Sequence, residues 1–592
     1  MASTFGSLEI AKSGLSVAMA NLKLTGHNIA NANTVGYTRQ RLITSAIEPT
    51  EGRYLLSQVT ADKTGRGVAI IDTQQIRNLY LDNQYRDLNM DYNYSEYRTN
   101  ALTYLEGLFN SELKEGQGIT GSLESFYQSL KDFANNTTSE EYRTSVQQAA
   151  VSLTENFKVL YDEMIDLWDD QNYSIKTNAD LINSTAEQIA RLNGAIAEYE
   201  RSGYTANDLR DQRNLLLDKL SGYVNMTYEI SDVNKSMIDV KIGGVDLVVG
   251  TSFNKIEVTS PSSHKTEIDA ITEQIADINA KILAGNITSL EGKDQIDELI
   301  ADLSNYIDVK LTANPENGDF LYDVTFNGVA LVYGSSSMEI EDAVEPNVIA
   351  RSMYYRNYLT LDLDDGVDLC IENGTVTSGE LYSHMEMVIS DGSGKTSGEG
   401  IPYYIDRLNE LARLIAQTIN DIHATGYTYP TDGQSSVTGV DFFNVPLDIN
   451  GNRDYSRITA GNFRLSDSIF ESVWNIAGSS DEISEDNTFS GNSRIAERLR
   501  DSFSDGKYYG SLNSLVSTLA ISLKTSKSIC ETKHSLLDSI DTQRMSISGV
   551  SIDEEATNLI VYQQSYNACS RVINALDEML DILIRNTGIV GR

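Results

Sequence analysis

The chain has 592 residues, of which 40% are hydrophobic and 22% charged, a composition that is ordinary for a folded protein of several domains. Its 46 lysine and arginine residues face 85 aspartates and glutamates, and the net charge of −39 opposes binding to nucleic acid or to an anionic membrane surface. No run approaches the roughly eighteen apolar residues of a membrane span, and the start lacks a secretory signal, so we expect no membrane insertion and, if the protein leaves the cell, another route of export.

The first predicted element is a helix over residues 5–29. Its seam repeats every seven residues and comprises Leu8, Leu15, Leu22 and Ile29. This spacing is typical of a coiled coil, and the alanines between the seam residues allow a partner helix to approach closely. The asparagines of residues 28–37 compete for backbone hydrogen bonds and Gly36 can adopt a positive φ, which predicts a turn. A glycine-led turn into a short strand is expected at residues 65–71.

Helical periodicity then continues, with interruptions, from residue 76 to about residue 222. Two seams, which begin at Val146 and at Ile175, indicate long helices that lie side by side. The charged segment 207–213 precedes a leucine-rich stretch. We interpret its charges as a solvated face, the alternative being a network that fixes how the helices cross.

The hydrophobic period changes from helical to alternating at residue 223. Residues 236–249 have the pattern of a hairpin, and a β-rich insertion of one or two subdomains is predicted to extend to residue 402. A charged helical hairpin near residues 265–307 interrupts it. Helical periodicity returns at residue 403 and continues, around a polar region, to residue 545.

The last predicted helix spans residues 552–585 and has the clearest seam in the chain. Its apolar residues alternate in steps of three and four: Leu559, Tyr562, Tyr566, Cys569, Ile573, Leu576, Leu580 and Leu583. Burying these side chains fully gains roughly 1.5–3 kcal/mol each, whereas ordering about thirty backbone residues costs on the order of 1–2 kcal/mol each. The helix therefore needs a partner, which an internal bundle or the helix at the beginning of the chain could supply.

The order of the elements predicts an elongated, multi-domain α+β fold. Residues 1–75 and 546–592 are expected to form a terminal helical domain with a short β and turn segment. Residues 76–222 and 403–545 are expected to form a helical rod, and residues 223–402 the inserted β-rich outer region.

The sequence contains no pattern that indicates catalysis. Cys370, Cys530 and Cys569 are too scattered for a disulfide framework or a metal site. The five histidines are separated by at least 39 residues, and neither a His-Glu-x-x-His nor a Gly-x-Ser-x-Gly arrangement is present. We therefore expect no enzyme activity, no cofactor and no metal ion.

Two stretches resemble a known family. Residues 28–40, NIANANTVGYTRQ, resemble the signature shared by bacterial flagellar rod, hook and hook-associated proteins. The motif SGVSIDEEATNL at residues 548–559, followed by YQQSYNA at residues 562–568, is similar to the hook-associated proteins of that superfamily that form the hook-filament junction, as is segment 208–213. The charged helical stretch at residues 265–307 has no counterpart in the resemblance.

The resemblance implies a non-catalytic extracellular component of the bacterial flagellum that forms a ring and joins the hook to the filament. It implies export by the flagellar type III system without a cleaved signal peptide, a cytoplasmic export chaperone on the C-terminal helix, and the hook protein and second junction protein as neighbours. Assembly would use the seams of the two terminal helices, together with the turn residues Asn31, Thr34, Gly36, Tyr37, Arg39 and Gln40.

Two alternatives remain open. The chain could be another flagellar axial protein, such as the hook, the distal rod or the second junction protein. It could instead be a secreted hydrolase or a glycan-binding adhesin, which would need a convergent polar site in the insertion at residues 223–402.

Overall fold

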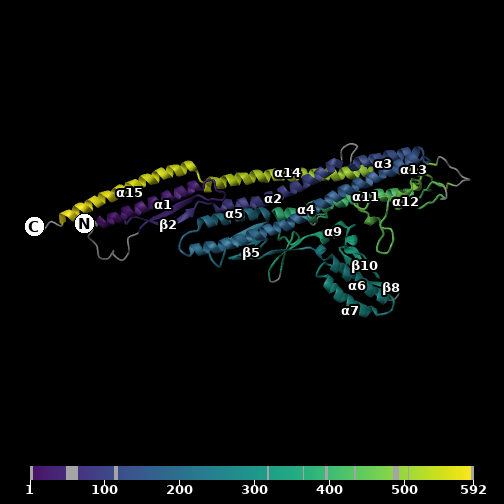
Figure 1. Cartoon of the computed structure of the whole chain (residues 1–592), viewed down its shortest axis with the longest axis horizontal. Helices are drawn as coiled ribbons and strands as arrows, with labels where there is room; N and C mark the ends of the chain where they lie inside the picture. Colours follow the sequence, from purple (N-terminus) through teal and green to yellow (C-terminus); the bar gives the residue numbers. More distant parts are fainter. Residues whose placement is uncertain are drawn as a thin grey trace. The chain divides into compact units, whose positions relative to one another are not determined.

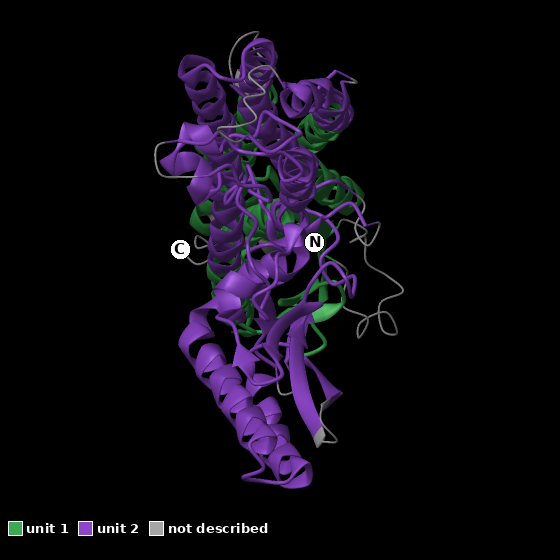
Figure 2. Ribbon diagram, turned by 90° about the vertical axis from the view of Figure 1, so that its right-hand side faces the viewer, with its two compact units in different colours: residues 1–92, 182–255, 532–592 green, residues 93–181, 256–531 purple. Residues whose placement is uncertain are grey.

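The computed structural model describes residues 4–47, 65–112, 118–316, 319–363, 366–393, 398–431, 435–483, 492–504 and 506–587. Its helices and small antiparallel sheets make an α+β fold, as predicted. The chain divides into two compact units (Figure 2): unit 1 comprises residues 1–92, 182–255 and 532–592, and unit 2 comprises residues 93–181 and 256–531. The three-part domain organisation expected from the sequence is a different division, and it stays a prediction.

Three long helices contribute residues to both units: α2 (Leu79–Glu112), α4 (Glu140–Glu200) and α14 (Lys507–Ser548). Within the described residues, no helix is both long enough and apolar enough to span a membrane.

Unit 1 is built from the two ends of the chain and one internal segment. Its other elements are α1 (Thr4–Ala30), β1 (Gln40–Ala46), β2 (Val68–Gln75), α5 (Asn207–Tyr223), β3 (Met226–Ile230), β4 (Ile238–Ile242), β5 (Val245–Val249), β6 (Ser252–Phe253) and α15 (Ile552–Thr587). Strands β1 and β2 pair antiparallel, with a β-bulge between Ile43 and Thr44. Strands β3 to β6 form a four-stranded antiparallel sheet in chain order.

The predicted pairing of the two ends of the chain is confirmed, because α1 and α15 pack against each other along their lengths (Figure 1). Small residues make this possible: Ala11 and Ala18 are buried, and a Cβ added to Gly14 would lie 3.0 Å from the sulfur of Cys569. On α15, Leu576 is buried at 8% exposure. The close approach of the backbones follows from the seam of small residues in α1.

Unit 2 contains the remaining elements. The helices are α3 (Gly118–Asn135), α6 (Lys265–Leu283), α7 (Ser289–Leu303), α8 (Ile340–Val344), α9 (Val348–Tyr355), α10 (Glu380–Ile389), α11 (Ile401–His423), α12 (Asp467–Glu471) and α13 (Arg494–Asp501), with 3-10 helices η2 (Pro261–His264), η3 (Tyr455–Arg457) and η4 (Val473–Asn475). The strands are β7 (Ile256–Thr259), β8 (Lys310–Glu316), β9 (Asp319–Phe326), β10 (Val329–Tyr333), β11 (Ser336–Ser337), β12 (Tyr358–Leu361) and β13 (Val367–Leu369).

One of the cores of unit 2 is aromatic. The ring of Phe126 from α3 lies 5.9 Å from Phe442 and 5.5 Å from Phe503, and all three side chains are buried. The amide of Asn420 on α11 accepts from the backbone nitrogens of Phe442 and Phe443, at 2.9 and 2.8 Å, and so holds this irregular segment against the helix. A side-chain amide can replace a strand partner in this way because it carries both a donor and an acceptor.

A second core lies between α6, α7 and the sheet β8 to β11. It contains Ile275, Ile296, Leu331 and Val332, all fully buried, and extends onto α8 and α9. The charged stretch at residues 265–307 is therefore a pair of helices whose apolar faces cover a sheet. Helices α8, α9 and α10 also lie within the segment predicted to be β-rich, so that segment mixes helices with strands.

We expect protonation of His423 to destabilise unit 2. The ring is fully buried; its Nδ1 donates to the carbonyl of Val440 at 2.7 Å and its Nε2 accepts from the backbone nitrogen of Ala477 at 2.8 Å, so the neutral form satisfies both partners. Burial lowers the pKa of His423 to about 4. Because the unfolded chain binds this proton near pH 6.5, up to about 3 kcal/mol of stability is lost as the pH falls from 6.5 to 4.

Urea unfolding at pH 7 and at pH 4.5 measures this effect. The difference in unfolding free energy between the native protein and His423→Gln, which cannot titrate here, is expected to shrink at pH 4.5. An equal difference at both pH values would show that His423 does not lose a proton on folding.

Candidate assembly site

The asparagine-rich turn after α1 is held by one buried side chain. Asn28, only 2% exposed, donates to the carbonyl of Gln40 at 3.0 Å and accepts from the Gln40 nitrogen at 3.2 Å and from the Tyr37 hydroxyl at 2.8 Å. Burial and nearby carboxylates raise the pKa of Tyr37, so its hydroxyl remains a donor. Gly36 has a φ of 81°, as expected for a turn glycine. The turn therefore fixes the first residue of β1 against the end of α1.

Arg39 ties the same turn to the start of α15. Its backbone nitrogen donates to the carbonyl of Ser548 at 2.8 Å, its Nε lies 2.8 Å from Oε1 of Glu555, and its Nη1 lies 2.7 Å from Oε2 of Glu554. Glu555 is 2% exposed, whereas the Glu554 side chain is 63% exposed. Although burial opposes the charge of Arg39, the hydrogen bonds to both carboxylates raise its pKa. The Arg39–Glu555 pair is thus the strong half of this contact.

The N-terminus of α5 is hydrogen-bonded to residues of both β1 and β2. Asn207, 5% exposed, donates to the carbonyl of Thr73 at 2.7 Å and to Oε1 of Gln40 at 3.2 Å. The side chain of Gln40 in turn donates to Asp208 at 2.8 Å. Our interpretation of segment 207–213 as a solvated face was wrong for Asn207, Asp211 and Arg213, which are buried. These buried residues instead form a polar network, which was the alternative interpretation of the segment.

Asp211 is the centre of that network. It accepts from the backbone nitrogen of Thr38 at 3.0 Å and from the amide of Gln75 at 2.7 Å, and Arg77 lies 3.6 Å away. Burial raises the pKa of Asp211 to about 6, against the opposing effects of Thr38 and Arg77. One carboxylate thereby joins α5 to the segment that leads into β1 and to the end of β2.

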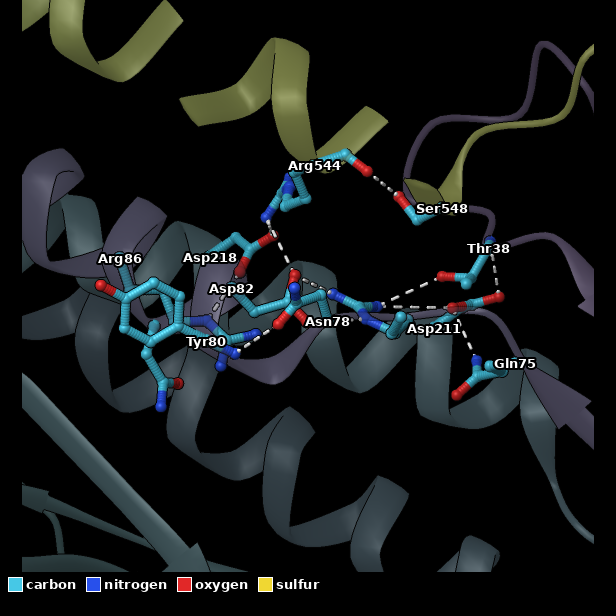
Figure 3. Close-up of polar contacts among 12 residues, drawn as sticks. Thr38, Gln75, Asn78, Tyr80, Asp82, Arg86, Asp211, Asp218, Arg544 and Ser548 are labelled. Atoms are coloured by element: carbon cyan, nitrogen blue, oxygen red, sulfur yellow. Dashed lines mark hydrogen bonds and ion pairs between the residues drawn. The ribbon is translucent and has the colours of Figure 1, made fainter. Parts of the chain in front are cut away.

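A second cluster connects α5 to α2 and to the end of α14 (Figure 3). Arg544 donates to Asp218 at 2.7 Å, and Nε of Arg86 reaches the other oxygen of Asp218 at the same distance. Arg77 forms two hydrogen bonds of 3.0 Å with Asp82. These pairs lie inside unit 1 and are mostly buried. They therefore fix the relative orientation of the helices more strongly than surface ion pairs do.

The predicted seam residues lie on the two paired helices with graded burial. Leu576 is buried, and most others are half-buried: Leu8, Leu15, Leu22 and Ile29 on α1, and Leu559, Tyr562, Tyr566, Cys569, Ile573 and Leu580 on α15. Leu583 is the exception, at 53% exposure. Partial burial on this scale means that the pair of helices covers only part of each seam.

An apolar stripe remains open beside the seam of α15. Val561, Val572 and Met579 recur at helical spacing on one face, and together with the exposed seam residue Leu583 they make a stripe of side chains that are each 50–53% exposed. The stripe continues into a groove of about 600 Å³, lined mainly by small and apolar residues of α1, of α15 and of the start of β2: Ser7, Ile10, Ala11, Ser13, Gly14, Gly67, Val68, Ala568, Cys569 and Val572. Exposed apolar side chains beside an apolar groove are a typical contact site for another protein.

The site residues predicted from the sequence fall into two groups in the structure. The turn residues Asn31, Thr34, Gly36, Tyr37, Arg39 and Gln40 lie together at the α1–β1 connection, while the seam residues lie along the helix pair. The sequence did not predict a role for Asp82, Arg86, Asp218 and Arg544, because their charged side chains have no distinctive spacing. In the described part of the chain, no three histidine, cysteine or acidic side chains converge in a way that could hold a metal ion.

Models of flagellar protein families match most of the chain. A family model described as the flagellar hook-associated protein FlgK helical domain matches residues 102–267 and 262–443, which together span more than half of the chain. Models described as the flagellar basal body rod FlgEFG protein C-terminal and the flagella basal body rod protein match residues 542–586 and 8–38, which contain most of α15 and α1.

Individual relatives extend over the whole chain. It is 28% identical over 597 residues to flagellar hook-associated protein 1 of Bacillus subtilis (strain 168), covering 100% of both chains. It is 24% identical over 608 residues to flagellar hook-associated protein 1 of Salmonella typhimurium (strain LT2), covering 97% of this chain and 98% of that one. The solved flagellar hook junction protein FlgK of Burkholderia pseudomallei has a TM-score of 0.48 and 12% identity, covering 79% of this chain and 100% of that one.

Proposed function

The chain belongs to the family of the flagellar hook-associated protein FlgK, a structural component of the flagellum, and from this premise we propose that it joins the hook to the filament. Family membership implies association with other flagellar axial proteins. The proposed neighbours are further copies of the chain in a ring, the hook protein and the second junction protein. The role requires no catalysis.

The observation that carries the proposal is the open apolar stripe beside the α1–α15 pair. Val572 and Met579 are about half exposed, next to a groove that the same two helices line. Burying four such side chains against neighbours would gain roughly 0.8–1.5 kcal/mol for each, since about half of every side chain is still exposed. A subunit that presents this surface is stabilised by the neighbours it meets in an assembly.

A joint between two assemblies needs the α1–α15 pair to be held at a fixed angle to the rest of unit 1. The polar network at the base of the pair supplies this. Arg39 and Asn28 hold the start of β1 against the ends of both helices, and Asp211 holds the segment before β1 and the end of β2 against α5. The stripe is therefore presented from a rigid base. Export by the flagellar type III system without a cleaved signal, and capture of α15 by a cytoplasmic chaperone, are part of the proposal and follow from the family alone.

We expect α1 and α15 to exchange their amide hydrogens faster than α4 and α11 in the isolated protein. Both terminal helices have half-buried seams, whereas α4 and α11 carry many fully buried residues. Hydrogen exchange followed by mass spectrometry measures this directly for residues 4–29 and 552–585. Protection equal to that of α11 would argue that the pair is complete without neighbours.

Labelling the protein on isolated flagella tests the location. The proposal predicts label only where the hook meets the filament. Label along the whole hook, in the rod or between this junction and the filament would instead identify a hook, distal rod or second junction protein. A binding or hydrolytic activity that is lost on deleting residues 260–339, while filaments still assemble, would support an adhesin or a hydrolase.

A further inference from the structure

Two parts of the chain share one architecture. In unit 1, the end of α4 and then α5 precede the meander β3–β4–β5–β6; in unit 2, α6 and α7 precede the meander β8–β9–β10–β11. Each sheet is four-stranded and antiparallel, with its strands in chain order. Figure 1 labels α5 and β5 of the first set, and α6, α7, β8 and β10 of the second.

The sequences of the two sets correspond. At a shift of 84 residues, segments 238–250 and 322–334 share seven of thirteen residues: Asp239 and Asp323, Val240 and Val324, Gly244 and Gly328, Val245 and Val329, Leu247 and Leu331, Val248 and Val332, Gly250 and Gly334. The helices before them share the tetrapeptide EQIA, at residues 187–190 and 273–276. The shift is 86 residues at this tetrapeptide and 83 residues at the end of the next helix, where Leu220, Ser221 and Tyr223 match Leu303, Ser304 and Tyr306.

The backbone of the two meanders corresponds at its irregular positions as well. The turn at Gly243 and Gly244 has φ values of 55° and 88°, and the turn at Asn327 and Gly328 has 46° and 82°. Both sheets carry a register irregularity at the equivalent point, directly after the pairs Val240–Val248 and Val324–Val332. Irregularities of this kind are set by local sequence, so their repetition is stronger evidence than strand order alone.

One buried asparagine clasps helix to meander in each set. Asn193, fully buried on α4, donates to the carbonyls of Ile238 and Gly250 at 2.8 and 2.7 Å and accepts from the Ile238 nitrogen at 3.2 Å. The equivalent backbone groups in the second set belong to residues 322 and 334. Their asparagine is the fully buried Asn279 on α6, which makes the same three bonds at 2.8, 2.6 and 3.0 Å.

A carboxylate completes the correspondence. The backbone nitrogen of Gly250 donates to Asp239 at 2.7 Å, and that of Gly334 donates to Asp323 at 2.7 Å. Four equivalent hydrogen bonds, which join seven polar atoms, thus recur in each set. Two unrelated hairpins with glycine turns would not be expected to share this arrangement, because each buried polar group could be satisfied by many different partners.

We propose that residues 265–340 are a second copy of the module at residues 182–256, formed by tandem duplication, and that Asn193 and Asn279 are its positioning residues. This explains the charged helical stretch that the family resemblance leaves without a counterpart. The second copy also lacks two of the polar residues that anchor the first copy. At the shift of 83 residues that relates α5 to α7, the anchoring residues Asn207 and Asp218 correspond to Leu290, which is 71% exposed, and to Ala301.

Exchanging segments within the full-length chain tests the duplication. Residues 237–250 are replaced by residues 321–334, and the matched control replaces them with residues 320–333, which slips the register by one and turns every side chain to the opposite face. The register-matched chimera is expected to melt within about 5 °C of the native protein and the slipped chimera more than about 15 °C lower. Equal melting of the two chimeras, high or low, would overturn the proposal.

The clasps are tested separately by hydrogen exchange. Asn279→Leu is expected to accelerate exchange at least about tenfold across residues 265–340 and to leave residues 182–256 unchanged, with Asn193→Leu giving the converse for the first copy. The control Asn286→Leu changes an exposed asparagine in the α6–α7 turn and should have no such effect. If Asn279→Leu left the exchange of residues 265–340 unchanged, Asn279 would not position the module.

Discussion

Replacing Arg39 with alanine is expected to lower the free energy of unfolding of unit 1 by about 3 kcal/mol. The Glu555 carboxylate, whose side chain is 3% exposed, would then remain buried without the guanidinium that it faces at 2.8 Å. Removing one partner of a buried pair costs more than the pair itself contributes, because the remaining charge has neither water nor a counter-ion. Urea unfolding followed by circular dichroism measures the loss.

Arg41 provides the matched control two residues along the same strand. Its side chain is exposed and donates to Gln74 at 3.1 Å, so Arg41→Ala should change stability by less than about 0.5 kcal/mol. The double variant Arg39→Met with Glu555→Leu leaves no buried charge and should recover most of the loss. Equal effects of Arg39→Ala and Arg41→Ala would show that the link between the turn and α15 contributes no more to the free energy of unfolding than a surface contact does.

Aspartate substitutions at Leu576 and at Met579 are expected to affect assembly through different contacts. Leu576 is 8% exposed in the helix pair, so a buried carboxylate there costs several kcal/mol and should separate α1 from α15 in the free protein. Met579 is 51% exposed on the open stripe, so its aspartate variant should leave the free protein unchanged and fail only where neighbours meet. Both variants are expected to reduce the number of filaments at least about tenfold.

Circular dichroism of the free protein and electron microscopy of cells that carry each variant separate the two effects. Asn574→Asp adds the same charge at an exposed polar position of α15 and should leave both folding and filaments unchanged. Global unfolding by Leu576→Asp would identify α15 as an internal core element. Normal filaments with Met579→Asp would exclude the stripe as a contact between subunits.

Much of the helical framework could be predicted from the sequence because it depends on periodicity. The seven-residue repeat of α1 and the alternating steps of α15 correctly predicted two helices that pair with each other. The turn at residues 28–37 was predictable for a similar reason, since asparagine and glycine act on the local backbone. Short elements such as α8 and α9, with five and eight residues, are too brief for a helical period to be read.

The polar network could not be predicted, because its partners are far apart in the sequence. Asp211 accepts from Thr38, 173 residues away, and Arg544 reaches Asp218 across 326 residues. Charged residues in a helix are usually solvated, and only the fold shows that Asp211 is buried. The repeated module leaves only short stretches of identical residues, at a shift of 84, in the sequence. These stretches become evidence for a repeat only when the matching hydrogen bonds of Asn193 and Asn279 are seen.

Electron microscopy of flagella from a strain that lacks the gene tests the central claim most directly. The protein is proposed to join hook to filament, so cells without it should carry hooks of normal form that end without filaments. Restoring the native chain should restore filaments, and the Met579→Asp variant should not. Filaments attached to hooks in the absence of the gene would contradict the account, whatever the behaviour of the isolated protein.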